Sequence, residues 1–289
     1  MFKKKKDQTY QSYWSISWNI FKKNKVAMVC LFIVILLCLI ALFAPLIAPY
    51  DPNKQVLTDR LMKPCGQHWF GTDDLGRDIF SRIIYGCRVS LSVGIISQII
   101  ATVIGYTMGV CAGYYGGKVD SVISFLIQVF SSFPFLLFAM AIMFVLGPGL
   151  INLYLALGLL GWASTARLIR GDVMRLKKME YIDACKVSGG NSFRIIMKHL
   201  LPNCLSTLIV TVTLGIPNAI MSEASLSFLG LGVKAPMASW GSMISFSQPY
   251  IRSATYYSVI PGLAIIITVL AFNMLGDGLR DALDPKKRK

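Results

Sequence analysis

The sequence predicts an all-α membrane protein with six transmembrane helices and one structured, charged loop between the fourth and the fifth. Its composition is 55% hydrophobic and 15% charged, and the mean hydropathy is +0.59. Soluble domains usually carry about 25% charged residues, so this balance excludes an ordinary soluble fold. Six uncharged stretches approach or exceed the ~20 residues that a helix needs to cross a bilayer. They are residues 26–48, 89–113, 121–146, 150–166, 204–222 and 253–276.

Helices are expected rather than strands, because the ten-residue alternating segments of a membrane barrel are absent. The third and fourth stretches form one uncharged block that the turn Gly147-Pro148-Gly149 divides. The fourth stretch is short, and Arg167 or Arg170 can extend it by snorkelling.

Residues 1–25 are expected to form a cytoplasmic interfacial segment. After four lysines at positions 3–6, Tyr10, Trp14, Trp18 and Phe21 fall on one helical face. This pattern favours an anchor that sets orientation over a ligand-binding role for the lysines. Residues 26–48 should then remain as the first transmembrane helix, since the apolar run is too long for a signal peptide.

Residues 49–88 should form an extracytoplasmic segment, because three prolines close the first helix at positions 45, 49 and 52. Within it, Thr72 or Asp73 is expected to cap a short helix that ends near Arg82. Arg77 and Arg82 can neutralise nearby acids. A pair of aspartates, Asp74 and Asp78, suggests acid–base chemistry, but no second catalytic group accompanies it.

Residues 89–276 are expected to form a five-helix core. Gly105 and Gly109 make a GxxxG pair that lets two helices approach closely, and prolines at 134, 217 and 261 should kink their helices. Polar side chains within the spans either bond a neighbouring helix, which is commoner, or line a pathway. They are Gln98, Gln128, Asn152, Asn218 and Asn273.

Glu223 is the one acid at the outer end of a span, and its expected place is the membrane interface, where a carboxylate costs least. The apolar segment that follows it, through Trp240 and Tyr250, should lie on the outer surface. The last 13 residues, 277–289, are expected to form a cytoplasmic tail.

The formal net charge of +15 invites a nucleic-acid function, but the distribution of charge points to the membrane instead. With the N-terminus inside, 21 of the 29 lysines and arginines fall in inside segments and the other 8 outside. This bias places both termini in the cytoplasm. The 7 cysteines form no disulfide framework and no metal-ligand spacing; Cys65 and Cys87 alone could meet outside.

The loop at residues 167–203 is the most informative stretch. Its first helix, around residues 181–188, should end at Gly189-Gly190, where a positive φ permits a reversal. A second helix, capped by Asn191 or Ser192, should present an apolar face of Phe193, Ile196, Met197 and Leu200, and Pro202 should mark the entry into the fifth span. A short helix displayed in this way suits recognition by a groove on a partner, although a plain solvated loop has the same spacing.

The loop resembles the signature of ABC importer permeases, an E-A-A triplet followed by a glycine. Asp183-Ala184-Cys185 stands at the triplet, Gly189 at the glycine and Leu201-Pro202 at the closing Leu-Pro. Asp for Glu keeps the charge, and Cys for Ala keeps a small side chain. The resemblance implies the type I importer permease fold and a loop that couples to ATPases. The coupling residues it implies are Glu180, Tyr181, Asp183, Ala184, Cys185, Ser188, Gly189, Gly190 and Pro202.

Four further motifs resemble the dipeptide/oligopeptide/nickel branch, and within it the second permease of the pair. They are FGTDDLGRDIFSR at 70–82, AGYYGG at 112–117, EASLSFLGLG at 223–232 and LGDGLRDALDP at 275–285. The resemblance implies a prokaryotic cell-membrane protein that works with a second permease subunit, two cytoplasmic ATPase subunits and an extracytoplasmic substrate-binding protein. Peptides are the expected cargo, and nickel complexes or other small peptide-like solutes remain the alternative.

The sequence itself carries no sign of catalysis. It contains no G-x-x-x-x-G-K-[ST], HExxH or GxSxG, so no catalytic residues, cofactor or metal are expected, and ATP should bind to the partner subunits. Two other classes fit less well. An ion-coupled secondary transporter ordinarily shows inverted repeats and an ionisable residue inside a span, and an intramembrane protease needs paired catalytic groups at membrane depth.

Overall fold

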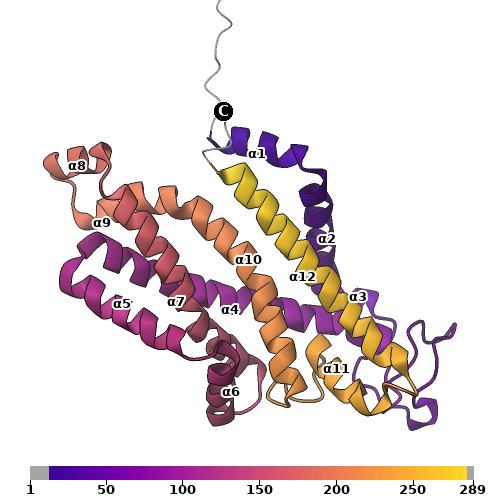
Figure 1. Ribbon diagram of the computed structural model, residues 1–289. Helices are drawn as coiled ribbons and strands as arrows, with labels where there is room; N and C mark the ends of the chain where they lie inside the picture. The colour runs from indigo at the N-terminus through magenta and orange to yellow at the C-terminus, as the bar shows by residue number, and fades with distance from the viewer. Residues whose placement is uncertain (1–12, 285–289) are drawn as a thin grey trace, which may run out of the picture.

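The computed structural model describes residues 13–284, and the regular elements among them are helices (Figure 1). Four helical runs are long and apolar enough to cross a membrane, or five when one bent pair is counted. The four are α2 (Lys25–Leu42), α4 (Ile79–Tyr115), the run Ser192–Phe228 that contains α10 (Leu201–Phe228), and α12 (Thr255–Leu283). The bent pair is α5 (Gly117–Ser132) with α6 (Phe135–Leu146), and α7 (Leu150–Leu176) covers the fourth expected stretch.

Shorter elements lie at the two ends of the bundle (Figure 1). One end carries α1 (Tyr13–Lys23), α8 (Glu180–Val187) and the last described residues of the chain; it is called the α8 end. The other carries the segment 48–78 and α11 (Trp240–Ser247), and is called the α11 end. The remaining short elements are α3 (Ala44–Ile47), η1 (Leu57–Asp59), α9 (Ser192–Ile195), the π-helical turn η2 (Ile196–Leu200) and η3 (Gln248–Tyr250).

The third expected span is not one straight helix. Its two halves, α5 and α6, meet at an angle of 89°. Pro134 causes the break, because the residue before a proline is driven out of the helical region, and Phe133 is extended at φ −94° and ψ 140°. The expected kink at this proline is therefore confirmed, and the stretch 121–146 is a helix pair broken at Pro134. Pro217 and Pro261 lie inside continuous α10 and α12.

Glycines let α4 and α7 pack backbone to backbone, which makes this the most extensive helix pair of the described chain. A Cβ on Gly105 would lie 2.7 Å from the carbonyl oxygen of Trp162, and one on Gly109 would lie 2.7 Å from that of Ala166. A third glycine, Gly113, continues the stripe one turn further along α4. The expected close approach at the GxxxG pair is thus confirmed.

Gly109→Val is accordingly expected to separate α4 from α7. The added side chain must displace the α7 backbone, and such overpacking usually costs about 1–3 kcal/mol or more. The midpoint of thermal unfolding in detergent should fall clearly below that of the unmodified chain. Gly171→Ala is a matched control, because a Cβ there meets open space. An equal midpoint for both variants would contradict this packing.

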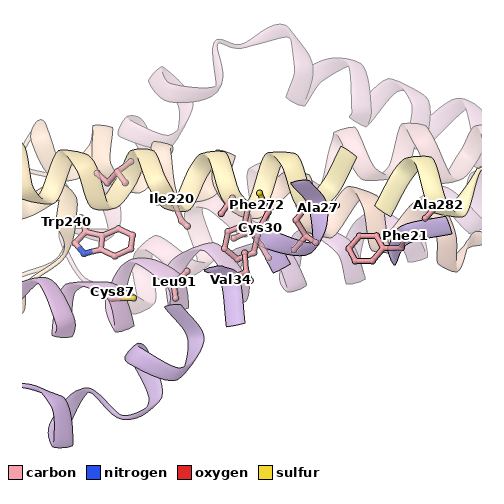
Figure 2. Close-up of a cluster of buried hydrophobic side chains, with 14 residues drawn as sticks. Phe21, Ala27, Cys30, Val34, Cys87, Leu91, Ile220, Trp240, Phe272 and Ala282 are labelled. Carbon is pink, nitrogen blue, oxygen red and sulfur yellow. The ribbon is translucent and has the colours of Figure 1, made fainter. Parts of the chain in front are cut away.

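A second core joins α2, α12, α10 and α4 (Figure 2). Phe272 of α12, Val34 and Cys30 of α2 and Leu91 of α4 meet in its middle, and Phe21 of α1 lies at one end. Phe21 is only 3% exposed, whereas Trp14 and Trp18 are about half exposed. The predicted aromatic face of the first helix is thus divided between core and surface, and Tyr10 and the lysines at 3–6 lie outside the described residues.

The segment before α4 folds around a buried carboxylate. Asp73 is fully buried and accepts hydrogen bonds from the backbone N–H of Leu75 and Arg77 at 2.9 Å, and its Oδ2 lies 2.6 Å from Arg77 Nε. Arg82 Nε stands 3.4 Å from the same oxygen. The expected neutralisation of acids by these arginines is confirmed.

The expected capping of a short helix by Thr72 or Asp73 is wrong. Asp78 is the N-cap: its Oδ2 accepts from the Ser81 backbone N–H at 2.7 Å, and the helix that starts there continues to Tyr115. Asp78 also lies 2.9 Å from His68 Nδ1, and Asp74 accepts from the Tyr257 hydroxyl at 3.1 Å. Both aspartates therefore hold local structure. Cys65 and Cys87 are free thiols, the first exposed and the second buried.

Glu223 is accommodated by hydrogen bonds within the protein, and not by exposure at the surface of the bundle. The residue is fully buried in α10, and its carboxylate accepts three serine hydroxyls. Ser227 donates at 2.6 Å, Ser239 at 2.7 Å and Ser90 at 3.3 Å. These donors come from α10, from the N-cap of α11 and from α4. One side chain thus fastens three elements at the α11 end, because a buried carboxylate needs hydrogen-bond donors around it.

Candidate functional site

The helix α8 stands at the edge of the α8 end and projects from the bundle (Figure 1). Its last turn closes as a Schellman motif. Gly189, at φ +80°, donates its N–H to the Lys186 carbonyl at 3.0 Å, and Gly190 donates to the Cys185 carbonyl at 2.9 Å. A Cβ on Gly190 would lie 2.7 Å from that same carbonyl oxygen. The two glycines therefore have different roles. Gly189 adopts the left-handed backbone conformation, and Gly190 leaves room for the Cys185 carbonyl.

One side chain ties α8 to the bundle. Ile182 is fully buried and packs in a cluster with Ile169 and Val173 of α7, Ile195 of α9 and Leu200 of η2. The same cluster continues to Val110 of α4 and to Cys204 and Leu208 of α10. The short helix thus packs where five other helical elements meet. Sequence reasoning missed Ile182, although it is the apolar residue on the inner side of the predicted helix.

The expected coupling residues lie together on and beside α8, with one exception. Glu180, Tyr181, Asp183, Ala184 and Ser188 are exposed, Cys185 is half-buried, and Gly189 and Gly190 form the turn. Pro202 lies instead in the first turn of α10 and lines a cavity described below. Val187, which sequence reasoning did not select, is 89% exposed at the end of α8.

The second helix of the loop differs from expectation in its buried face. Asn191 caps it as predicted, with its Oδ1 accepting from the Arg194 N–H at 2.8 Å. Ile195 and Leu200 are buried, whereas Phe193 is 72% and Met197 44% exposed. The π-helical turn 196–200 is the reason, since its wider spacing shifts the register of the side chains, and the chain then continues into α10 without a break.

Polar contacts connect this loop to the turn between α4 and α5. Lys177 donates to the Tyr114 carbonyl and lies over the Tyr114 ring, and the Tyr114 hydroxyl is 3.4 Å from Ser192 Oγ. Arg170 holds Asp120 of α5 in a two-pronged ion pair at 2.5 and 2.7 Å. Tyr114 of the AGYYGG motif thus supports the loop, and polar contacts link α4, α5, α7 and α9.

Cys185 lies beside His199, with its Sγ 3.6 Å from the imidazole Nε2. Alanine fits the same space, because it only removes the sulfur of a half-buried side chain. The resemblance implies that this loop couples to ATPases, and in a complex with them we expect Cys185→Ala to change substrate-dependent ATP hydrolysis by less than about twofold, within 0.5 kcal/mol. An ATPase assay of the assembled complex measures this change, with Ser132→Ala as control, because the exposed Ser132 hydroxyl bonds only the Gln128 carbonyl of its own helix. A loss above tenfold would show that the thiol itself is required.

A cavity of about 1290 Å³ opens along one face of α10, between α7 and α4. The α10 side chains that line it recur every three or four residues over five turns, so they share one face. The polar ones are Asn203, Ser206, Thr207, Thr211, Asn218 and Ser222. Charged lining residues, Arg175, Arg280 and Asp284, stand at the α8 end.

Two of the polar span residues left open by the sequence belong to this cavity. Gln98 and Asn218 both line it, and their hydrogen bonds go to their own helices, to Thr102 Oγ1 at 3.2 Å and to the Leu214 carbonyl at 3.2 Å. The pathway interpretation therefore fits these two. Asn152 instead donates to the carbonyls of Leu146 and Gly147 and closes the turn before α7.

Residues 102–289 match the protein family described as binding-protein-dependent transport system inner membrane component, and residues 12–64 match the N-terminal transmembrane domain of oligopeptide transport permease C. Among curated proteins, the chain is 46% identical to the dipeptide transport system permease protein DppC of Bacillus subtilis, over 96% of this chain and 87% of that one.

Two more relatives extend this comparison. The chain is 42% identical to the oligopeptide permease protein OppC of the same organism, over 96% and 91% of the two chains. It is 41% identical to the glutathione permease protein GsiD of Pectobacterium atrosepticum, over 97% and 94%.

Among solved structures, the chain resembles a chain of the inward-facing MetNI methionine ABC transporter, with a TM-score of 0.58 at 19% identity. The superposition covers 71% of this chain and 98% of that one. This likeness supports the fold.

Proposed function

This chain belongs to the family of inner-membrane components of binding-protein-dependent transport systems, with the type I ABC importer permease fold, and we propose from that membership that it imports short peptides. It is a transport permease and a multi-pass membrane protein. The proposed complex pairs it with a second permease subunit, two ATPase subunits inside and a substrate-binding protein outside. In this assembly the chain supplies pathway and coupling, and the partner subunits bind and hydrolyse ATP.

The proposed orientation places the α8 end in the cytoplasm and the α11 end outside. The excess of lysine and arginine on inside segments supports it, and α1 and the end of α12 lie at the same end of the bundle as α8 (Figure 1). The folded segment 48–78 then faces the binding protein, and α8 faces the ATPases.

The observation that carries the pathway assignment is the cavity along α10. Its polar lining runs from Asn203 near the loop to Ser222 near the other end, so one helix face connects the two sides of the molecule. Polar side chains are costly inside a membrane unless they face a cavity or a partner. A second permease that covers this face would complete a closed path.

Coupling is proposed to run through α8. Its exposed side chains would fit a groove on an ATPase, and its buried Ile182 would carry each displacement into α7, α9, η2 and α10. A helix anchored by one buried side chain and closed by a rigid turn moves as a body, so movement of the ATPases shifts the helices that line the cavity.

Relatives named for dipeptides, oligopeptides and glutathione support peptide cargo. The test is reconstitution of the full complex in proteoliposomes that contain ATP, with uptake of radiolabelled tri-alanine measured with and without the binding protein. Uptake that requires both ATP and the binding protein supports the proposal. Uptake of a nickel chelate in place of the peptide would favour the alternative cargo, and uptake by this chain alone would contradict the division of labour.

A further inference from the structure

The middle of the α10 cavity holds polar groups whose hydrogen-bonding capacity is only partly used among the described residues. Ser97 of α4 is 2% exposed, lines the cavity, and its hydroxyl has no hydrogen-bond partner among the described residues. A buried hydroxyl without a partner costs about 1–3 kcal/mol, so a hydrogen-bonding partner that enters from the cavity, water or a bound solute, would relieve this cost.

Gln98 is next to it and reaches across to α10. Its amide lies against the backbone at Gly215 and fills the space that a Cβ there would take. The one hydrogen bond of its side chain among the described residues goes from Nε2 to Thr102 Oγ1, so the carbonyl oxygen and one N–H remain available. Because Gly215 has no Cβ, the Gln98 amide of α4 can pack directly against the α10 backbone.

Asn218 adds a second amide on the same face, three residues and therefore about 5 Å along the helix from Gly215. Its Nδ2 donates to Leu214, and Oδ1 has no protein donor among the described residues. Ser97 and Gln98 lie at the midpoint of α4, and Gly215 lies at that of α10. The three side chains therefore stand at half depth in the bundle.

This set is uncharged, and the charged lining residues are confined to the α8 end. Carboxamides and a hydroxyl offer both donors and acceptors, which is the pattern of a peptide bond. They offer no carboxylate, imidazole or thiolate of the kind that a divalent metal ion prefers. The site also cannot distinguish acidic from basic side chains by charge.

We propose that Ser97, Gln98 and Asn218 form a transit site that hydrogen-bonds the backbone amides of the peptide as it passes through the cavity. The inference rests on the proposed function and adds the residues and the chemical group that they recognise. Backbone amides are common to all peptides, so such a site accepts many sequences. Neutral hydrogen bonds are weak enough for the peptide to leave.

The test uses the full complex in proteoliposomes, with internal ATP and tri-alanine as probe. Gln98→Leu keeps the shape of the side chain and removes its hydrogen bonds. We expect uptake about 5–10-fold lower, the factor that one lost hydrogen bond gives, with ATP hydrolysis stimulated by the binding protein within about twofold of normal. Gln128→Leu is the matched control, because this exposed glutamine of α5 lies outside the cavity lining, and it should leave uptake unchanged.

Ser97→Ala tests whether the Ser97 hydroxyl acts on the peptide or only on the packing of the helices. Removal of an unpartnered buried hydroxyl should keep or raise the thermal midpoint, while uptake falls about twofold or more. Wild-type uptake in both Gln98→Leu and Ser97→Ala would overturn the site, and so would a joint fall of uptake, ATP hydrolysis and thermal midpoint. A wild-type complex that imports another solute but no tri-alanine would instead overturn the proposed function, and the site's substrate with it.

Discussion

A complex with Gly189→Pro is expected to insert and assemble normally, to hydrolyse ATP, and to import peptide at least about tenfold more slowly. Proline cannot adopt the φ of +80° found at this position, and it lacks the N–H that bonds the Lys186 carbonyl at 3.0 Å. The Schellman turn then opens, and α8 loses its fixed direction relative to α9. The ratio of peptide imported to ATP hydrolysed is the measurement.

Two milder variants locate the cause of this uncoupling. Gly189→Ala places a Cβ in the left-handed region, which costs about 1–2 kcal/mol, whereas Gly171→Ala on the exposed face of α7 has free space and no such cost. Only the first should lower the ratio.

Asp183→Lys leaves the backbone intact and reverses the charge of an exposed side chain that pairs with Lys186 at 2.8 Å. An exposed pair contributes little to stability, so a lowered ratio would report a lost contact with the ATPase. Normal uptake in both Gly189→Pro and Asp183→Lys would refute the coupling role.

The second large effect is expected at Glu223. Glu223→Ala removes the acceptor of three buried hydroxyls and leaves a cavity between α4, α10 and the start of α11. Loss of these bonds should lower the free energy of unfolding by about 2–4 kcal/mol. Proteolysis within residues 229–239 should become faster before the rest of the chain is cut, because that loop is fastened through Ser239.

Two substitutions make the Glu223 test specific. Glu223→Gln retains an acceptor for Ser227 and Ser239 and can donate to Ser90, so its effect should be below about 1 kcal/mol. Ser225→Ala, in the same helix, removes an exposed hydroxyl that bonds only its own helix at the Met221 carbonyl, and should be neutral. A stable Glu223→Ala variant with unchanged proteolysis would show that the serines find other partners.

Much of the fold is readable from the sequence because lipid imposes a simple rule. An uncharged run of sufficient length becomes a helix, and Gly105 and Gly109 predict where two helices touch. The Gly189-Gly190 turn and the Asn191 cap are local features, and they are found where the sequence predicts them. Each depends on neighbouring residues alone.

The missed features depend on residues distant in sequence. Glu223 is buried because serines from α4 and the N-cap of α11 converge on it. Asp78 caps α4, whereas Thr72 bonds the backbone of Asp59 and Met62. Asp73 is held by two arginines. A π-helical turn shifts the buried face of the loop's second helix, and the spacing of apolar residues in the sequence does not predict such a turn. Gln98 and Asn218 could be selected as polar, but only the fold places both on one cavity.

The length of α4 has a mechanical consequence. Its 37 residues extend for about 55 Å, well beyond the ~30 Å of the hydrocarbon layer. The rod begins inside the folded segment that carries Asp73 and ends against the loop that carries α8, and glycine contacts clamp it to α7 between these points. Because α4 is one continuous helix, a tilt imposed at one end also displaces the other end. In the proposed complex, docking of the loaded substrate-binding protein at one end and closure of the ATPase subunits at the other would both act on this one helix.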